Sequence, residues 1–207
     1  MILAKPLPPH IKDLPLNNGF LAIATVIKKT RTKAAFVLAL LCIGLAVYHQ
    51  EAPLPLEEPS VPAILGVFLI VAGMMFRIVA LGTIHKNDFV NRTGIYSLCR
   101  HPLYLGTILM GMGLCLIASD LTTFLIVTAY FLVYYTVTIA WEERLLRYRF
   151  GGDHVQYCAE TPLLIPYGQY IPGAFALRRA MQQGALGLVA IVIVTLVLLE
   201  LMARNFS

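Results

Sequence analysis

Long apolar runs alternate with short polar segments along the whole chain. A bilayer core requires about 20 apolar residues in helical conformation, and several runs approach that length. The pattern therefore predicts an all-α integral membrane protein with about five transmembrane helices. The predicted spans are residues 34–48, 61–84, 102–118, 121–141 and 185–202.

The third and fourth predicted spans are separated by two residues, Ser119 and Asp120. Such a short link predicts a hairpin of two antiparallel helices, so the end of the fourth span must lie beside the start of the third. Gly106 and Gly113 are seven residues apart in the third span and share one helix face. Close helix packing, or a cleft where a ligand touches the backbone, would each explain these glycines.

Composition supports a membrane protein, because 58% of the residues are hydrophobic and 13% are charged. The charged share is about half that of a typical soluble domain. The net charge of +5 is modest, and no basic domain or aromatic-basic patch indicates nucleic-acid binding. The charge distribution is instead informative about orientation in the membrane.

Lys and Arg are concentrated in alternate polar segments. Residues 1–33, 85–101 and 142–183 are basic, whereas residues 49–60 hold three glutamates and no Lys or Arg. The positive-inside rule then places the N-terminus in the cytoplasm and the C-terminus outside. We expect the N-terminal segment to contain an interfacial helix near residues 20–29 rather than a cleaved signal peptide. Residues 142–183 are predicted to form a cytoplasmic cap.

The four cysteines form no C-x-x-C pair. Cys42 and Cys115 fall inside predicted spans, where cysteine behaves as a small hydrophobic residue. Cys99 and Cys158 fall in segments predicted to be cytoplasmic and therefore reducing. We expect no structural disulfide and no metal site.

Arg77 lies well inside the second predicted span. A charge at that depth costs about 2.5–3.5 kcal/mol on the mildest insertion scale. Snorkelling toward the cytoplasmic interface, or a structural ion pair, would explain it. Participation in a ligand site is the other interpretation.

A second polar group precedes the third span, in the sequence "CRHPLYLG". Pro102 suits the first turn of a helix, and the amides at a helix N-terminus attract a carboxylate or phosphate. Arg100, His101 and Tyr104 add donors and an aromatic face. The alternative is an ordinary interfacial belt of polar and aromatic residues.

Glu142 and Glu143 end the fourth predicted span. Glu143 is spaced to pair with Arg147 one turn later, which would contribute only tenths of a kcal/mol. The hairpin, however, brings both glutamates near Arg100 and His101. Acids, cations and aromatic rings at one membrane edge suit a ligand that carries a carboxylate, an ammonium group, a ribose and a positive centre.

The ordered set "GIYSLCRHPLYLG", "GMG" and "EERLLRYRFGGDHVQYCAETPLLIP" resembles the isoprenylcysteine carboxyl methyltransferase and phospholipid methyltransferase superfamily. The resemblance covers about residues 70–166. It implies an integral membrane enzyme that uses S-adenosylmethionine to methylate a lipid or lipid-attached acceptor. The tail would fold back as a cap over the cofactor, with Ile165 and Pro166 as closing parts.

The resemblance also implies the residues of the site. Cofactor contacts would come from Tyr96, Arg100, His101, Pro102, Tyr104, Gly111, Gly113, Glu142, Glu143 and Tyr157. Catalysis would involve His101 or Glu143 as a base for an amine acceptor, or Arg77 as the holder of a carboxylate or phosphate. In the carboxyl methyltransferases an arginine precedes the glutamates by about one helical turn. The corresponding stretch of this chain, "TVTIAWEE", contains no arginine.

Two other functions compete with methyl transfer. A membrane reductase of the sterol type has a similar Arg-His-Pro-x-Tyr element and tail but binds NADPH. A non-catalytic membrane scaffold would retain the fold alone. The Gly-x-Gly element and the paired glutamates favour the methyltransferase. The fifth span is extra to the shared core and is a candidate surface for homodimer formation or substrate entry.

Overall fold

The computed structural model describes residues 26, 53, 60–84 and 90–206. The predicted span 34–48, nearly all of the basic segment 1–33, and Cys42 lie outside the described residues. The regular secondary structure of the described part is helical, apart from one isolated β-bridge between Gly94 and Ile171. The chain is thus an all-helical, multi-pass membrane protein in the part that the structure describes.

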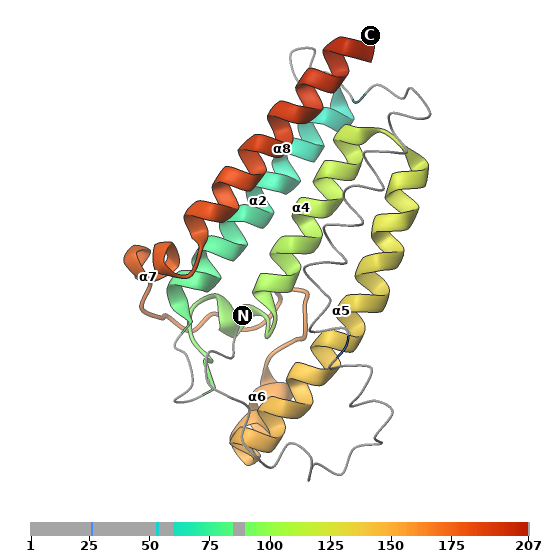
Figure 1. The fold of residues 1–207 in the computed structure, drawn as a ribbon. Coiled ribbons are helices and arrows are strands. Elements are labelled where there is room, and N and C mark those ends of the chain that lie inside the picture. Colours follow the sequence, from blue (N-terminus) through green and yellow to red (C-terminus); the bar gives the residue numbers. More distant parts are fainter. Residues whose placement is uncertain (1–25, 27–52, 54–59, 85–89, 207) are drawn as a thin grey trace.

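Four long helices form the body of the molecule, and three short ones lie at one end (Figure 1). The long helices are α2 (Val61–Thr83), α4 (Pro102–Ala118), α5 (Leu121–Phe150) and α8 (Ala185–Phe206). The short ones are α3 (Ile95–Leu98), α6 (Gly152–Glu160) and α7 (Leu177–Gln182). Helices α2, α5 and α8 are long and apolar enough to cross a membrane, and α4 is apolar but shorter.

The helical hairpin predicted between α4 and α5 is present. Ser119 ends α4 with a φ of 54°, in the left-handed region that reverses the chain. Asp120 then caps α5, because its two carboxylate oxygens accept hydrogen bonds from the amides of Thr122 at 2.8 Å and Thr123 at 2.6 Å. These two residues together satisfy backbone groups that a helix end leaves unpaired.

Predicted spans 61–84, 102–118 and 185–202 agree with α2, α4 and α8 to within a few residues. The fourth predicted span, 121–141, lies within α5, which continues beyond it to Phe150. The apolar run ends at Trp141, but Glu, Arg and Leu remain strong helix formers. The helix therefore continues past the point where the sequence changes from apolar to polar.

Glycines let α2 and α4 approach closely. A Cβ atom at Gly106 would lie 2.6 Å from the carbonyl oxygen of Gly73, and one at Gly113 would lie 2.5 Å from that of Gly66. Both pairs belong to antiparallel helices in backbone contact. The packing interpretation of Gly106 and Gly113 is thus confirmed, as expected for small residues between membrane helices.

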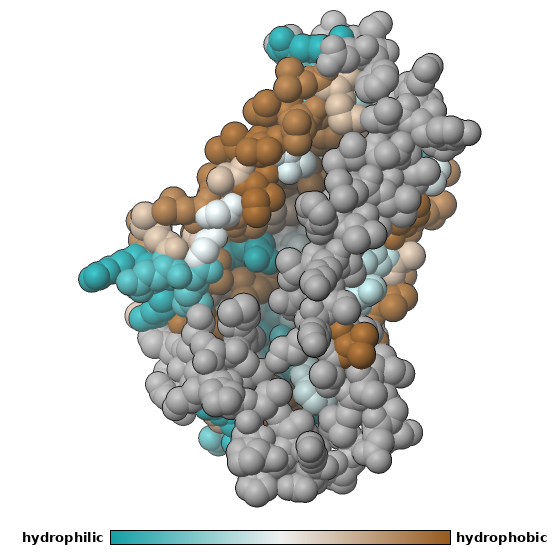
Figure 2. Space-filling model, viewed as in Figure 1, coloured by the Kyte–Doolittle hydropathy of each residue, from teal (hydrophilic) through white to brown (hydrophobic). Residues whose placement is uncertain are grey.

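Helix α8 covers the other side of α2. Val192 of α8 packs with Ile70 of α2 and with Met110 and Ile117 of α4. The outward side of α8 is lined with exposed Ile, Val and Leu side chains, which appear as a brown band in Figure 2. The apolar exterior is what a lipid-facing helix requires.

The segment after α6 folds back along the loop that precedes α4. The amide of Arg100 donates to the carbonyl oxygen of Pro162 at 2.9 Å, and that of Gly168 donates to Leu98 at 3.0 Å. Further along, the amide of Ala176 donates to Gly82 at 3.1 Å. Residues 161–176 therefore hold the ends of α2 and α4 together at one end of the molecule.

Candidate active site

The N-terminal turn of α4 and the middle of α5 bring the predicted acids and donors together. Tyr104 donates its hydroxyl to Glu142 Oε1 at 2.7 Å. His101 Nε2 lies 2.7 Å from Glu143 Oε1. The predicted meeting of the paired glutamates with the start of α4 is confirmed, and it follows from the two-residue hairpin.

Glu143 makes its contacts within the protein. Its Oε2 atom accepts a hydrogen bond from Arg100, and the thiol of Cys158 lies 3.3 Å from the same oxygen. With His101 on Oε1, both carboxylate oxygens have partners. Charge-assisted bonds of this kind fix side-chain geometry strongly. Glu143 thereby positions Arg100 and His101.

Glu142 has a different environment. Tyr104 occupies Oε1, whereas Oε2 is buried and has no hydrogen-bond partner among the described residues. The Nδ1 atom of His101 lies 4.0 Å from Oε2, which is too far for a hydrogen bond. A buried carboxylate oxygen without a donor is costly. Glu142 is accordingly the acid with capacity to bind a ligand.

Tyr96, on α3, adds an unsatisfied donor. Its side chain is buried and its hydroxyl has no hydrogen-bond partner among the described residues. Burial, followed by the neighbouring Tyr157 and Glu142, raises the pKa of Tyr96. The Nε1 atom of the buried Trp141, next to Glu142 in sequence, also has no acceptor in the described part of the chain. Tyr96 interacts electrostatically with Glu142, so a buried donor and a buried acceptor without partners among the described residues belong to one region, which indicates a ligand that carries both kinds of group.

Arg77 is directed at α4. Its guanidinium donates to the carbonyl oxygen of Leu103 at 3.2 Å and to the hydroxyl of Thr107. These contacts place a cation beside the first turn of α4, one turn from Tyr104. The geometry agrees with a structural role and also leaves Arg77 close to the site, so its part in catalysis stays a prediction.

Backbone amides before Pro102 are engaged by the tail. The amide of Arg100 donates to Pro162, and that of His101 donates to the carbonyl oxygen of Leu163 at 3.1 Å. The sequence interpretation concerned the amides of the first helical turn, which begins at Pro102, and the amides of Arg100 and His101 precede that turn. The returning segment takes up these two.

Helix α6 supplies the remaining contacts. Tyr157 donates its hydroxyl to the carbonyl oxygen of Tyr96 at 2.6 Å and so ties α6 to α3. His154 is fully buried, and burial lowers its pKa. Cys158 lies one turn beyond His154, and burial raises its pKa. Sequence reasoning did not select His154 or Cys158, although their i, i+4 spacing after "GGD" would place both on one face of a helix.

The other predicted site residues lie elsewhere. Gly113 packs against Gly66, and a Cβ at Gly111 would meet the ring of Phe131 in α5 at 2.5 Å. Both glycines lie about two turns from Tyr104 along α4. Pro102 is buried at the start of α4, whereas Ile165 and Pro166 are exposed. A cofactor role for these residues remains a prediction.

Comparison with known proteins identifies similar sequences. Residues 61–153 match the family model for phospholipid methyltransferase. The chain is 30% identical over 136 residues to the cobalt-zinc-cadmium resistance protein CzcN of Cupriavidus metallidurans, covering 66% of this chain and 61% of that protein. It is 26% identical over 98 residues to the protein-S-isoprenylcysteine O-methyltransferase of Schizosaccharomyces pombe, covering 47% and 42%. The matches thus span less than two thirds of either relative, and no solved structure matches the chain.

Proposed function

We propose that this chain, whose residues 61–153 match the phospholipid methyltransferase family model, transfers a methyl group from S-adenosylmethionine to a lipid or lipid-attached acceptor. The site would lie at the cytoplasmic face of the membrane. The similarity to the S. pombe O-methyltransferase supports the same reaction class. The residues of the described site must then fit the methyl donor.

The observation that carries this proposal is the buried Oε2 atom of Glu142, which has no hydrogen-bond partner among the described residues. S-adenosylmethionine presents an ammonium group and ribose hydroxyls, each of which can donate to that oxygen. The buried hydroxyl of Tyr96, which has no acceptor in the described part of the chain, suits the carboxylate or an adenine nitrogen of the methyl donor. The bound donor supplies an activated methyl group, and the protein's part is to hold it in line with the acceptor.

The two glutamates divide the work in this proposal. Glu142 would contact the methyl donor directly, with Tyr104 fixing its carboxylate through Oε1. Glu143 would be a positioning residue, because its oxygens already hold Arg100 and His101. If the acceptor is an amine, the pair of His101 and Glu143 is available to accept its proton.

An acidic acceptor needs a cation instead of a base. Arg77 is then the candidate holder, since its guanidinium lies beside the first turn of α4 at Leu103 and Thr107. Such an arrangement would admit an amphiphilic acceptor from the lipid near the N-terminal end of α4, while the soluble donor enters from water. The acceptor class therefore determines whether Arg77 or His101 carries the chemistry.

Donor binding by the purified full-length protein tests the proposal. Isothermal titration with S-adenosylmethionine should show one site, and Glu142→Gln should weaken it about ten- to hundredfold, because a charge-assisted hydrogen bond contributes about 1.5–3 kcal/mol. Glu160→Gln, which removes the same charge from the exposed end of α6, is the matched control and should bind as the wild type does.

The alternatives give different results in the same titration. Binding of NADPH without binding of S-adenosylmethionine would favour a reductase, and binding of neither would favour a scaffold. Either result overturns the proposal, as does normal binding by Glu142→Gln. Incubation with isotopically labelled donor and a total lipid extract would then identify the methylated species.

A further inference from the structure

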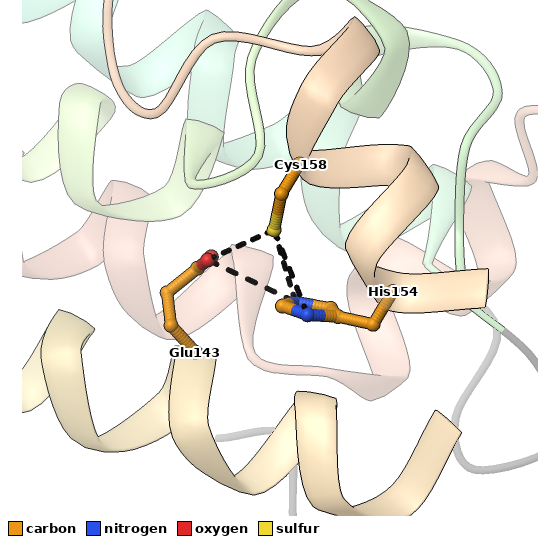
Figure 3. Close-up of side chains that lie close together, drawn as sticks. All are labelled: Glu143, His154 and Cys158. Carbon is orange, nitrogen blue, oxygen red and sulfur yellow. Dashed lines mark hydrogen bonds and ion pairs between the residues drawn. The ribbon is translucent and has the colours of Figure 1, made fainter. Parts of the chain in front are cut away.

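Besides the contacts of the glutamate pair with His101 and Tyr104, Glu143 takes part in a second cluster, in which side chains of α6 face it. Glu143 of α5 faces His154 and Cys158, which point toward it from successive turns of α6 (Figure 3). One oxygen, one nitrogen and one sulfur ligand atom lie within 4.8 Å of one another. His154 is fully buried, so the cluster is internal rather than a chance gathering of surface charges.

The spacing of these atoms matches one face of a tetrahedron. Bonds of about 2.0–2.3 Å from a tetrahedral cation to O, N and S separate its ligand atoms by roughly 3.3–3.6 Å. Cys158 Sγ lies 3.3 Å from Glu143 Oε2 and 3.8 Å from His154 Nε2. The His154 Nε2 to Glu143 Oε2 distance is 3.8 Å. Movements of a few tenths of an ångström would complete the coordination geometry.

We propose that Glu143, His154 and Cys158 form a binding site for one borderline-soft divalent cation, of which Zn²⁺ and Cd²⁺ are representative. A thiolate and an imidazole select such ions over Mg²⁺ and Ca²⁺, which prefer oxygen ligands alone. Three protein ligands leave a fourth position for water. His154 and Cys158 lie beyond the residues 61–153 that match the family.

Arg100 competes for the same ligands. Its guanidinium contacts both Glu143 Oε2 and Cys158 Sγ. A bound cation would take the place of this positive charge, while the Cys158 thiol releases its proton to water on binding. Arg100 must then move away from both ligand atoms. Cation binding and the position of Arg100 are therefore mutually dependent.

Because Arg100 competes with the cation, the proposal predicts the direction in which loss of Arg100 changes the affinity for Cd²⁺. Metal-free, full-length protein is titrated with Cd²⁺, and formation of the cadmium–thiolate bond is followed by ultraviolet absorbance. We expect one equivalent to bind, Cys158→Ser and His154→Asn to weaken binding at least about tenfold, and Arg100→Gln to strengthen it. Loss of Arg100 would weaken a cluster that is merely structural, so increased affinity distinguishes a cation site from a packing arrangement.

Controls keep the result independent of folding and of methyl transfer. Cys115→Ala, in α4 at the far end from the cluster, should bind Cd²⁺ as the wild type does, and Mg²⁺ should not compete. Mass spectrometry of the wild-type protein should show that Cd²⁺ protects Cys158 from alkylation. Absence of binding, unchanged affinity in Cys158→Ser, or unprotected Cys158 would overturn the proposal without bearing on donor binding at Glu142.

Discussion

Glu142 and Glu143 are adjacent and chemically identical, yet their surroundings give them different roles. Glu143 is enclosed by Arg100, His101 and Cys158, so both of its oxygens are engaged. Glu142 keeps one buried oxygen without a donor in the described part of the chain. A helix advances about 100° per residue, so neighbouring side chains face different partners. At the scale of a residue, environment and not type determines function.

Tyr157 offers a test of positioning at this scale. Tyr157→Phe removes the 2.6 Å hydrogen bond to the carbonyl oxygen of Tyr96, and we expect a loss of about 0.5–1.5 kcal/mol in the free energy of unfolding. Thermal denaturation in detergent measures it. Affinity for S-adenosylmethionine should fall less than it does in Glu142→Gln. A larger fall in affinity would show that the Tyr157 hydroxyl itself contacts the methyl donor.

The sequence predicted which residues of the site lie close together, but not which of them form hydrogen bonds with one another. The short hairpin was enough to bring Arg100, His101 and Tyr104 to the paired glutamates. The individual pairings depend on rotamers and on the return of residues 161–176, which no hydropathy pattern specifies. His154 and Cys158 escaped notice because their importance depends on how α6 is oriented against α5.

Elements were predicted better than contacts. Helix α4 (Pro102–Ala118) was predicted to the residue, because Pro102 and the Ser119–Asp120 turn are explicit boundary signals. Helix α5 extends nine residues beyond the predicted span 121–141, because the length of an apolar run predicts the membrane-crossing part of a helix and not the end of the helix. The close packing of α2 on α4 needed the glycines of both helices, and the sequence interpretation had considered only those of α4.

Substitution of a glycine between these helices tests their packing. In Gly106→Ala the new Cβ would lie 2.6 Å from the backbone oxygen of Gly73, so we expect a loss of about 1–3 kcal/mol in the free energy of unfolding. Gly187→Ala in α8 is the matched control, because a Cβ there meets nothing within 4 Å. Thermal denaturation should show a lower midpoint for Gly106→Ala alone. Equal midpoints would refute backbone contact between α2 and α4.

At the scale of the whole molecule, the site and the basic side chains share one end. Helices α6 and α7 lie at the end where α4 begins (Figure 1), and exposed Arg144, Arg147, Arg149 and Arg178 belong to that region. The opposite end of the hairpin carries Asp120. The distribution supports the predicted orientation, with the site in the cytoplasm and the α4–α5 turn outside.

Cysteine labelling tests that orientation. In a variant without native cysteines, Gln169→Cys should react with a membrane-impermeant maleimide only after the membrane is opened. Ser119→Cys, in the α4–α5 turn, should react in intact cells. Both positions are exposed in the structure, so accessibility is not limiting. The reverse pattern would place the site outside, and labelling of both in intact cells would exclude a membrane between them.

Helix α5 has 30 residues, which corresponds to a rod of about 45 Å, whereas the hydrocarbon layer is about 30 Å thick. Glu142 follows Leu121 by 21 residues, so it lies roughly 32 Å along that rod. The acid pair thus sits where hydrocarbon gives way to headgroups. A thicker bilayer would submerge it and separate it from any water-soluble reactant, whereas a thinner one would expose it. If the proposed methyl transfer takes place at this acid pair, the thickness of the surrounding lipid would control access of the water-soluble donor, and membrane composition would act on the reaction without any contact to the reacting atoms.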